Sequence, residues 1–104
     1  MNITLNEYQQ LAARSMLPQC RNINYLGLGL AGETGELCDK LKRIIRGDGK
    51  IDDDLLDEVG DCLWYLSQLA LFFHVELETI AIRNIAKLDA RMAQNTIAGK
   101  GDKR

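Results

Sequence analysis

One pattern, present twice, constrains the fold more than any other feature of the chain. Residues 30–41 and 55–66 place a leucine, an acid, a glycine, a second acid and a final leucine at matching positions, 25 residues apart. In both segments apolar residues recur every three or four positions, the period of a helix that buries one face. Gly47 and Gly49 lie between the segments and interrupt the helical pattern. Two helices joined by so short a turn should run antiparallel, with their matching patterns side by side.

The rest of the chain is also predicted to be helical. Pro18 is the only proline, and the β-branched residues form no alternating runs of the kind that mark strands. Thr4 and Glu7 have the spacing of a capping box, and the aspartates at 52–54 can cap a later helix. The first, third and fourth expected helices cover about residues 4–17, 52–73 and 76–94, and the second begins within residues 22–27 and runs to about residue 46. We therefore predict an all-α, four-helix bundle-like fold in a single domain, residues 1–104, with a flexible tail from about residue 96.

Composition limits the partners of such a domain. A chain of 104 residues builds only a thin core, yet 46% of this one is hydrophobic, so we expect it to self-associate. The net charge of −2 argues against binding nucleic acid by bulk electrostatics. No stretch of the chain approaches the ~20 apolar residues that a membrane span requires. We expect neither nucleic acid nor a membrane as a partner.

The cysteines and the first residues indicate a reducing compartment. Cys20, Cys38 and Cys62 are odd in number and share no CxxC spacing, which argues against a disulfide framework and against a zinc site. The N-terminus shows no basic region followed by an apolar run and a small-residue cleavage site. We therefore expect a cytoplasmic protein.

The two acid pairs are expected to lie beside the buried faces of their helices. At about 100° per residue, each pair falls next to an apolar stripe. The first stripe is Leu26, Leu30, Leu37, Leu41 and Ile44, and the second is Leu55, Val59, Cys62, Leu66, Leu69 and Phe73. The acids are Glu33 and Glu36 on the first helix, and Glu58 and Asp61 on the second.

Four half-buried acids that face one another predict a metal ion. They would repel each other unless a cation compensated their charge. Carboxylates without histidine or cysteine favour Mg²⁺, or alternatively Mn²⁺, over zinc. An ordinary solvated helix face is the alternative for each pair alone. A di-iron carboxylate bundle would need Glu-x-x-His pairs, and the chain contains none.

The last expected helix carries the opposite charge. Asn84, Lys87 and Arg91 are spaced so that they share one arc of that helix. Cations beside a metal ion are what a transferring phosphoryl group requires, because they offset charge on the phosphate chain. For Arg91, a favourable interaction with the helix dipole is an equal alternative.

These residues together resemble a known family. The pair Glu33-x-x-Glu36 within LGLAGETGEL, then Glu58-x-x-Asp61 within DEVGDCLWYL, look like the signature of the MazG-type, all-α nucleoside triphosphate pyrophosphohydrolases. The segment from Asn84 through Lys87 continues the likeness, and the ending GKGDKR is similar to the GxGDxR ending of small phage- and bacterial-type members. The resemblance covers about residues 5–104.

The resemblance implies a reaction and an assembly. It implies Mg²⁺-dependent cleavage of a nucleoside triphosphate, non-standard or deoxy, to the monophosphate and pyrophosphate. The four acids would hold one or more metal ions, one of them assisting the attacking water, and Asn84 and Lys87 would contact metal-bound phosphates. Family members are dimers or tetramers with sites between subunits. The alternatives are a phosphoribosyl-ATP pyrophosphohydrolase-like enzyme and a non-catalytic helical module that binds a nucleotide or a partner.

Several other residues allow two interpretations. Trp64 and Tyr65 could form a subunit interface or stack on a base. Gln9 and Arg14 resemble positions near the nucleotide, although a solvated face would explain them equally well. His74 is expected in a turn.

Overall fold

The computed structural model describes residues 1–94, which form four α-helices and one short 3₁₀ helix and contain no strand. These are α1 (Leu5–Ala13), η1 (Pro18–Cys20), α2 (Ile23–Arg46), α3 (Asp53–Phe72) and α4 (Leu77–Ala93). The predicted all-α class is confirmed, and three of the four predicted helices lie where the sequence placed them. The predicted tail lies outside the described residues. Among those residues, no helix is both long and apolar enough to cross a membrane.

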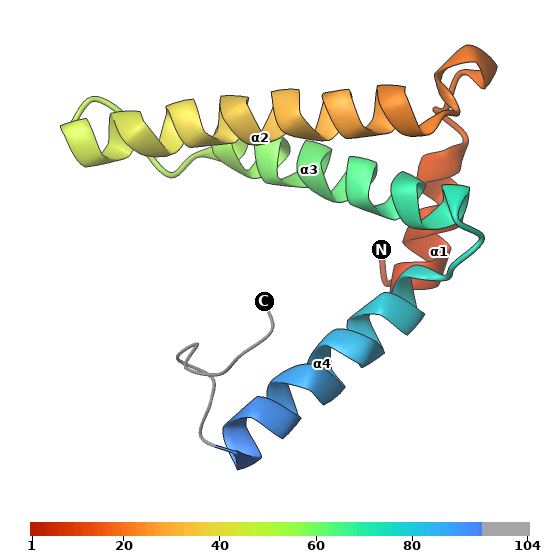
Figure 1. Cartoon of the computed structure of the whole chain (residues 1–104). Helices are drawn as coiled ribbons and strands as arrows, with labels where there is room; N and C mark the ends of the chain where they lie inside the picture. Colours follow the sequence, from red (N-terminus) through yellow and green to blue (C-terminus); the bar gives the residue numbers. More distant parts are fainter. Residues whose placement is uncertain (95–104) are drawn as a thin grey trace.

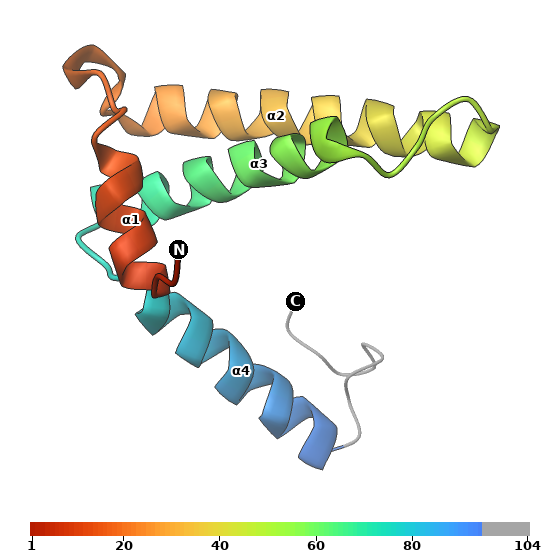
Figure 2. The same cartoon turned by 180° about the vertical axis from the view of Figure 1, so that it is seen from behind.

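The helices α2 and α3 form an antiparallel pair (Figure 1, Figure 2). The side chain of Asn22 caps α2 by accepting a hydrogen bond from the Tyr25 N–H, and Asp52 caps α3 through the Leu55 N–H. Gly47, with φ 98°, ends α2 in the left-handed conformation that glycine adopts without cost. The pairing that the repeated pattern predicts is therefore present.

The first helix is shorter than expected. It begins with the predicted capping box between Thr4 and Glu7 but ends at Ala13, four residues early. The indole N–H of Trp64, from α3, donates to the Ala12 carbonyl and to the Ser15 hydroxyl. The Ala12 carbonyl also accepts from the N–H and the hydroxyl of Ser15, so the end of α1 is held both locally and by α3. There α1 crosses the end of the α2–α3 pair (Figure 2).

Gln9 joins three helices. It is only 1% exposed, and its side-chain amide donates to the carbonyls of Ser67 and Val75 while its oxygen accepts from the Leu77 N–H. Of the two interpretations of Gln9, the solvated face is wrong, because the side chain is buried and joins the helices of the scaffold. Arg14 is exposed and its Nε donates to the Leu11 carbonyl.

The start of α4 is capped by α1. Glu76 stands at the N-cap without a side-chain cap of its own. Instead Asn6 accepts from the Glu78 N–H, Glu78 accepts from the Asn6 N–H, and Gln9 accepts from the Leu77 N–H. These bonds satisfy the free N–H groups of the first turn. They also hold α4 at an angle that leads away from α2 and α3 (Figure 1).

One chain therefore forms an open arrangement with a small core. The radius of gyration is 16.3 Å, against about 13 Å for a compact chain of this length. The buried apolar residues of the described part are Leu26, Leu55, Ala70 and Leu77. Large apolar side chains remain exposed, among them Ile45 at 88% and Ile82 at 68%.

The predicted apolar stripe of α3 is wrong in part. Val59, Leu66 and Phe73 are 48%, 48% and 54% exposed. The face of α3 that α1 covers instead contains Ser67 and Gln68, whose polar groups bond to Gln9. Hydrophobicity alone did not identify this face because polar side chains with hydrogen-bond partners can be buried at little cost.

Candidate metal centre

Three carboxylates from α2 and α3 converge. Glu33, Glu36 and Glu58 each offer an oxygen, and these oxygens lie within 4.8 Å of one another. Two residues three apart on α2 face one residue of α3 because the helices are antiparallel and in matching register. We call these residues the acid cluster. No other group of three or more acids, histidines or cysteines in residues 1–94 is arranged so closely.

The acid cluster contains buried oxygens that have no partner. Glu33 Oε2 and Glu58 Oε2 are both inaccessible to solvent and accept no hydrogen bond within residues 1–94. A buried, unpaired carboxylate oxygen is costly, and a bound cation is one of the few ways to compensate it. The donor set consists of carboxylate oxygens only, which suits a hard divalent ion. The residues present therefore fit a metal.

The crowding of negative charge changes the acidity of Glu33. Burial first, then the close approach of the Glu58 carboxyl and the charges of Glu36, Asp61 and Glu58, raise the pKa of Glu33. Each of these effects disfavours the ionised form of the side chain. A cation at the cluster would reverse the effect of the neighbouring charges, because it stabilises carboxylates in their ionised form.

Asp61, the fourth predicted acid, lies beside the cluster. It is exposed, and it lines a hollow of about 320 Å³ on the side facing α1. This aromatic hollow is formed by Ser15, Glu33, Asp61, Trp64 and Tyr65. The charge of Asp61 contributes to the raised pKa of Glu33. The structure thus brings all four predicted acids to one place, with three in the tight cluster and Asp61 at its edge.

Trp64 and Tyr65 form the wall of the aromatic hollow. Their rings meet edge to face, with centroids 4.9 Å apart. Tyr65 packs against α2 at Gly29, where a methyl group would overlap its ring. Both side chains are half-buried. Trp64 is fixed by its hydrogen bonds to α1, so it is a rigid part of the wall.

Two residues near the acids were not predicted from the sequence. Ser15 lines the aromatic hollow, and Tyr8 lies near Asp61. Burial first, and then the charge of Asp61, raise the pKa of Tyr8. Both belong to the segment from α1 to η1, and no spacing rule connects them to the acid pairs. Only the crossing of α1 over α3 brings them here.

A second hollow lies on the opposite side of the acid cluster, toward the end of α2. It measures about 510 Å³, and we call it the basic hollow. It is lined by Gly32, Gly35, Glu36, Asp39, Lys40, Arg43 and Glu58. Arg43 forms an ion pair with Asp39 at 2.9 Å.

Within one chain, the helix α4 with the predicted arc of Asn84, Lys87 and Arg91 leads away from the acids. Asn84 and Lys87 are exposed. No α4 residue lines the aromatic hollow or the basic hollow. The second half of α4, blue in Figure 1, lies clear of the α2–α3 pair in both views (Figure 1, Figure 2). The predicted substrate-binding residues Asn84, Lys87 and Arg91 therefore stand apart from the predicted metal ligands.

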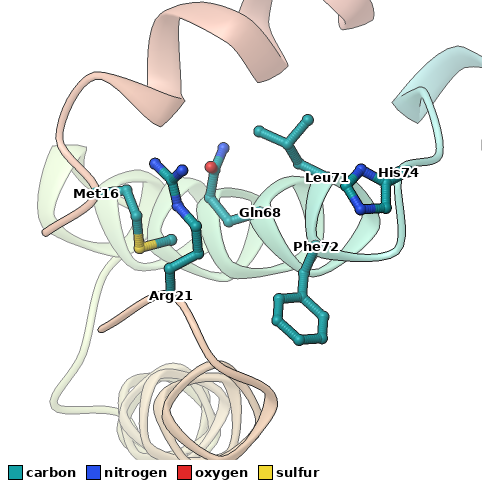
Figure 3. A pocket seen from close by; sticks show the side chains of 6 residues that line it. All are labelled: Met16, Arg21, Gln68, Leu71, Phe72 and His74. Atoms are coloured by element: carbon teal, nitrogen blue, oxygen red, sulfur yellow. The ribbon is translucent and has the colours of Figure 1, made fainter. Parts of the chain in front are cut away.

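A third hollow belongs to the scaffold. It measures about 410 Å³ and lies along the C-terminal half of α3 (Figure 3). Its lining is Met16, Arg21, Gln68, Leu71, Phe72 and His74, with none of the acids. Gln68 uses its amide to donate to Gln9 and Ser67. His74 has φ 58° and ends α3 in the expected turn, with its N–H bonded to the Leu71 carbonyl.

Comparison with known proteins agrees with this geometry. A family model described as the MazG nucleotide pyrophosphohydrolase domain matches residues 21–95, a span that includes all four acids and the arc of α4. The chain is also similar to the gene 37 protein of Mycobacterium phage L5. The two are 44% identical over 87 residues, which are 79% of this chain and 76% of the phage protein. No solved structure matches significantly.

Proposed function

The chain belongs to the MazG nucleotide pyrophosphohydrolase family, and from this premise we propose that it hydrolyses a nucleoside triphosphate to the monophosphate and pyrophosphate with Mg²⁺. The observation that supports this most strongly is the acid cluster with two buried, unpartnered carboxylate oxygens. MazG-type enzymes depend in general on a divalent metal. Mg²⁺, with Mn²⁺ as a possible substitute, is the ion that an all-carboxylate donor set favours.

Each acid has a part in the proposed reaction. Glu33, Glu36, Glu58 and Asp61 would hold the metal, which when bound neutralises phosphate charge and makes water a better nucleophile. One carboxylate would orient the attacking water and accept its proton. The oxygen of that water bonds to the α-phosphorus, and the bond from this phosphorus to the bridging oxygen breaks. The bonding electron pair leaves with the pyrophosphate.

We propose that Asn84, Lys87 and Arg91 act on the site of a second copy. Within one chain the helix α4 that carries them leads away from α2 and α3 (Figure 2), yet the charges of Lys87 and Arg91 suit a phosphate chain. The open arrangement also leaves large apolar residues of α4 exposed, such as Ile82 and Ile85, and a symmetric dimer would cover equivalent surfaces on both copies. A homodimer, or a tetramer of two dimers, would satisfy both requirements.

A turnover assay tests the proposed reaction. Purified protein with Mg²⁺ is incubated with standard, deoxy and non-standard nucleoside triphosphates, and pyrophosphate is measured separately from orthophosphate. Pyrophosphate should be the first product, with the highest kcat/KM for a non-standard or deoxy nucleotide. Orthophosphate as the first product would place the attack at the terminal phosphate. Selective cleavage of phosphoribosyl-ATP, or binding without turnover, would favour one of the two alternatives.

One substitution with a matched control assigns the activity to the acid cluster. Glu58→Gln removes one charge from the cluster and should lower kcat/KM at least about 100-fold, because even indirect partners of a metal contribute 10–100-fold. Asp57→Asn makes the same chemical change at the adjacent, exposed position of α3. It should leave kcat/KM within about twofold. Equal losses in the two variants would remove the acid cluster from the mechanism.

A further inference from the structure

The two sides of the acid cluster differ in chemistry. Toward α1 lies the aromatic hollow, with the rings of Trp64 and Tyr65 and the hydroxyl of Ser15. Toward the end of α2 lies the basic hollow, with Lys40 and Arg43. A further hollow of about 210 Å³ shares the same two cations and adds Lys50, together with Asp48, Asp52 and Asp54. The two ends of the site along the α2–α3 pair therefore differ: one is aromatic, and the other carries Lys40 and Arg43.

Lys40 and Arg43 follow directly after the metal-binding acids. They come four and seven residues after Glu36, which places them roughly 6 Å and 10 Å further along the helix axis. Lys40 is half-buried and forms no ion pair with any residue of the described chain. Arg43 bonds to Asp39, but Asp39 also pairs with Lys42, so its single charge serves two cations.

The backbone beside these cations is open. A side-chain carbon added at Gly32 or Gly35 would meet nothing within 4 Å, although both residues line the basic hollow. These glycines therefore do not serve contact between the helices of this chain. They widen the hollow where Glu36 and Glu58 border it, which leaves room for the oxygens of an anionic ligand.

We propose that Lys40 and Arg43 hold the leaving pyrophosphate, so that the substrate lies along α2 and α3 in one direction only. This inference rests on the proposed function. The α-phosphate lies at the acid cluster, the β- and γ-phosphates extend over the glycines toward Lys40 and Arg43, and the nucleoside occupies the aromatic hollow. When the bond between the α-phosphorus and the bridging oxygen breaks, the electron pair goes to the pyrophosphate, and the two cations offset its increased charge.

The proposed direction of the substrate predicts that the two products, pyrophosphate and the nucleoside monophosphate, depend on different residues. Pyrophosphate should depend on Lys40 and Arg43, whereas a nucleoside monophosphate should not, because its single phosphate stays at the acid cluster. The test measures binding of Mg²⁺–pyrophosphate and of nucleoside monophosphates by titration calorimetry on the intact protein. Lys40→Gln should weaken pyrophosphate binding about tenfold, the cost of about one charge-assisted hydrogen bond. Its effect on monophosphate binding should stay within about twofold.

Lys42→Gln is the matched control. It removes the same charge from the neighbouring turn of α2, but Lys42 lines neither hollow and its side chain is 64% exposed. Without Lys42, Asp39 pairs with Arg43 alone, but this exposed ion pair is weak, so both affinities should stay within about twofold. Arg43→Gln provides a second, independent variant and should resemble Lys40→Gln. The proposal is overturned if Lys40→Gln and Arg43→Gln leave pyrophosphate binding unchanged, or weaken the monophosphate by the same factor.

Turnover is measured in parallel to keep this inference separate from the proposed function. If the wild type binds pyrophosphate through Lys40 yet releases none from any triphosphate, the proposed hydrolysis is wrong and the assignment of the two cations stands. If the wild type releases pyrophosphate and neither variant changes its binding, the hydrolysis stands and the direction of the substrate is wrong.

Discussion

The α2–α3 pair carries the predicted metal ligands, and α4 carries the predicted substrate-binding residues. Within a single chain these two groups of residues lie apart. The pair brings its four acids together within the chain, because two matching segments on antiparallel helices meet in register. The helix α4, which carries Asn84, Lys87 and Arg91, leads away from the α2–α3 pair (Figure 1). The difference teaches that one hairpin is enough to gather the acids, whereas α4 would reach such a cluster only in the proposed assembly.

The cause of the difference lies in α1. Its side chains Asn6 and Gln9 cap the first turn of α4 and hold that helix at an angle away from the pair. The α2–α3 hairpin needs no such help, because Gly47 and Asp52 end one helix and begin the next locally.

Mixing two inactive variants tests most strongly whether α4 of one copy serves the acid cluster of another. Glu58→Gln damages the acids, and Lys87→Ala damages α4, so each alone should lower kcat/KM about 100-fold or more. If α4 serves the partner's acids, a mixed dimer keeps one intact site out of two. Equal mixing, in which half of the dimers are mixed, should restore about a quarter of wild-type activity. Activity is followed by pyrophosphate release after unfolding and refolding the mixture.

A second mixture is the control for complementation. Glu33→Gln and Glu58→Gln both damage the acid cluster, which is contained in one chain, so mixing them should restore nothing. Recovery in this control would mean that the acids, too, are shared between copies. No recovery with Lys87→Ala would instead mean that α4 does not serve the neighbouring site.

Two glycines of α2 test whether the pair is closely packed. Gly29→Ala would place a methyl group against the Tyr65 ring and should lower the free energy of unfolding by about 1–3 kcal/mol. Gly27→Ala, two residues earlier, meets nothing within 4 Å. It should raise the free energy of unfolding by about 0.5–1 kcal/mol, because alanine loses less entropy than glycine in a helix. Denaturant titration measures both, and effects of equal sign would contradict the packing of Tyr65 on α2.

The smallest expected effect is the pH dependence of the metal-free protein. The pKa of Glu33 is raised in the folded state, so the stability contributed by its protonated form is fully present below the ordinary glutamate pKa. That stability is lost as the pH rises through the raised pKa. In the presence of a chelator, the free energy of unfolding of Glu33→Gln should therefore rise relative to that of the wild type as the pH increases from acidic to neutral.

Saturating Mg²⁺ should reverse the order of these two proteins at neutral pH. A ligand at 100 times its Kd stabilises the folded state by about 2.7 kcal/mol, and the variant has lost one of the carboxylates. Thermal unfolding with and without Mg²⁺ measures the effect. A constant difference in Tm across pH, unaffected by Mg²⁺, would show that Glu33 is not crowded by the other acids.

Several local features were predictable because their causes are local. The capping box at Thr4, the turn at Gly47 and the cap at Asp52 depend on neighbours within a few residues. The register of Glu33 with Glu58 follows from the repeat and the short turn together. The early end of α1 was not predicted; there the Ala12 carbonyl accepts from the nearby Ser15 and also from Trp64, which lies 52 positions away in the chain.

The buried face of α3 was a similar case. Its apolar periodicity pointed to Val59 and Leu66, which are half-exposed, whereas Ser67 and Gln68 are buried. A polar side chain enters a core when a partner is available. The buried Gln68 amide donates to the Gln9 carbonyl, 59 positions away, and to the Ser67 hydroxyl. The capping of α4 by α1 depends on the same kind of distant contact.

By itself, the sequence determined the four helices, the antiparallel pair and the acids that meet on it, because helix period, caps and breakers act over a few residues. Only the tertiary structure decided that α4 points away from those acids, that Tyr8 and Ser15 lie near them, and that Lys40 and Arg43 border the site opposite the aromatic rings. These placements depend on hydrogen bonds and packing between residues far apart in the chain, which no local pattern records.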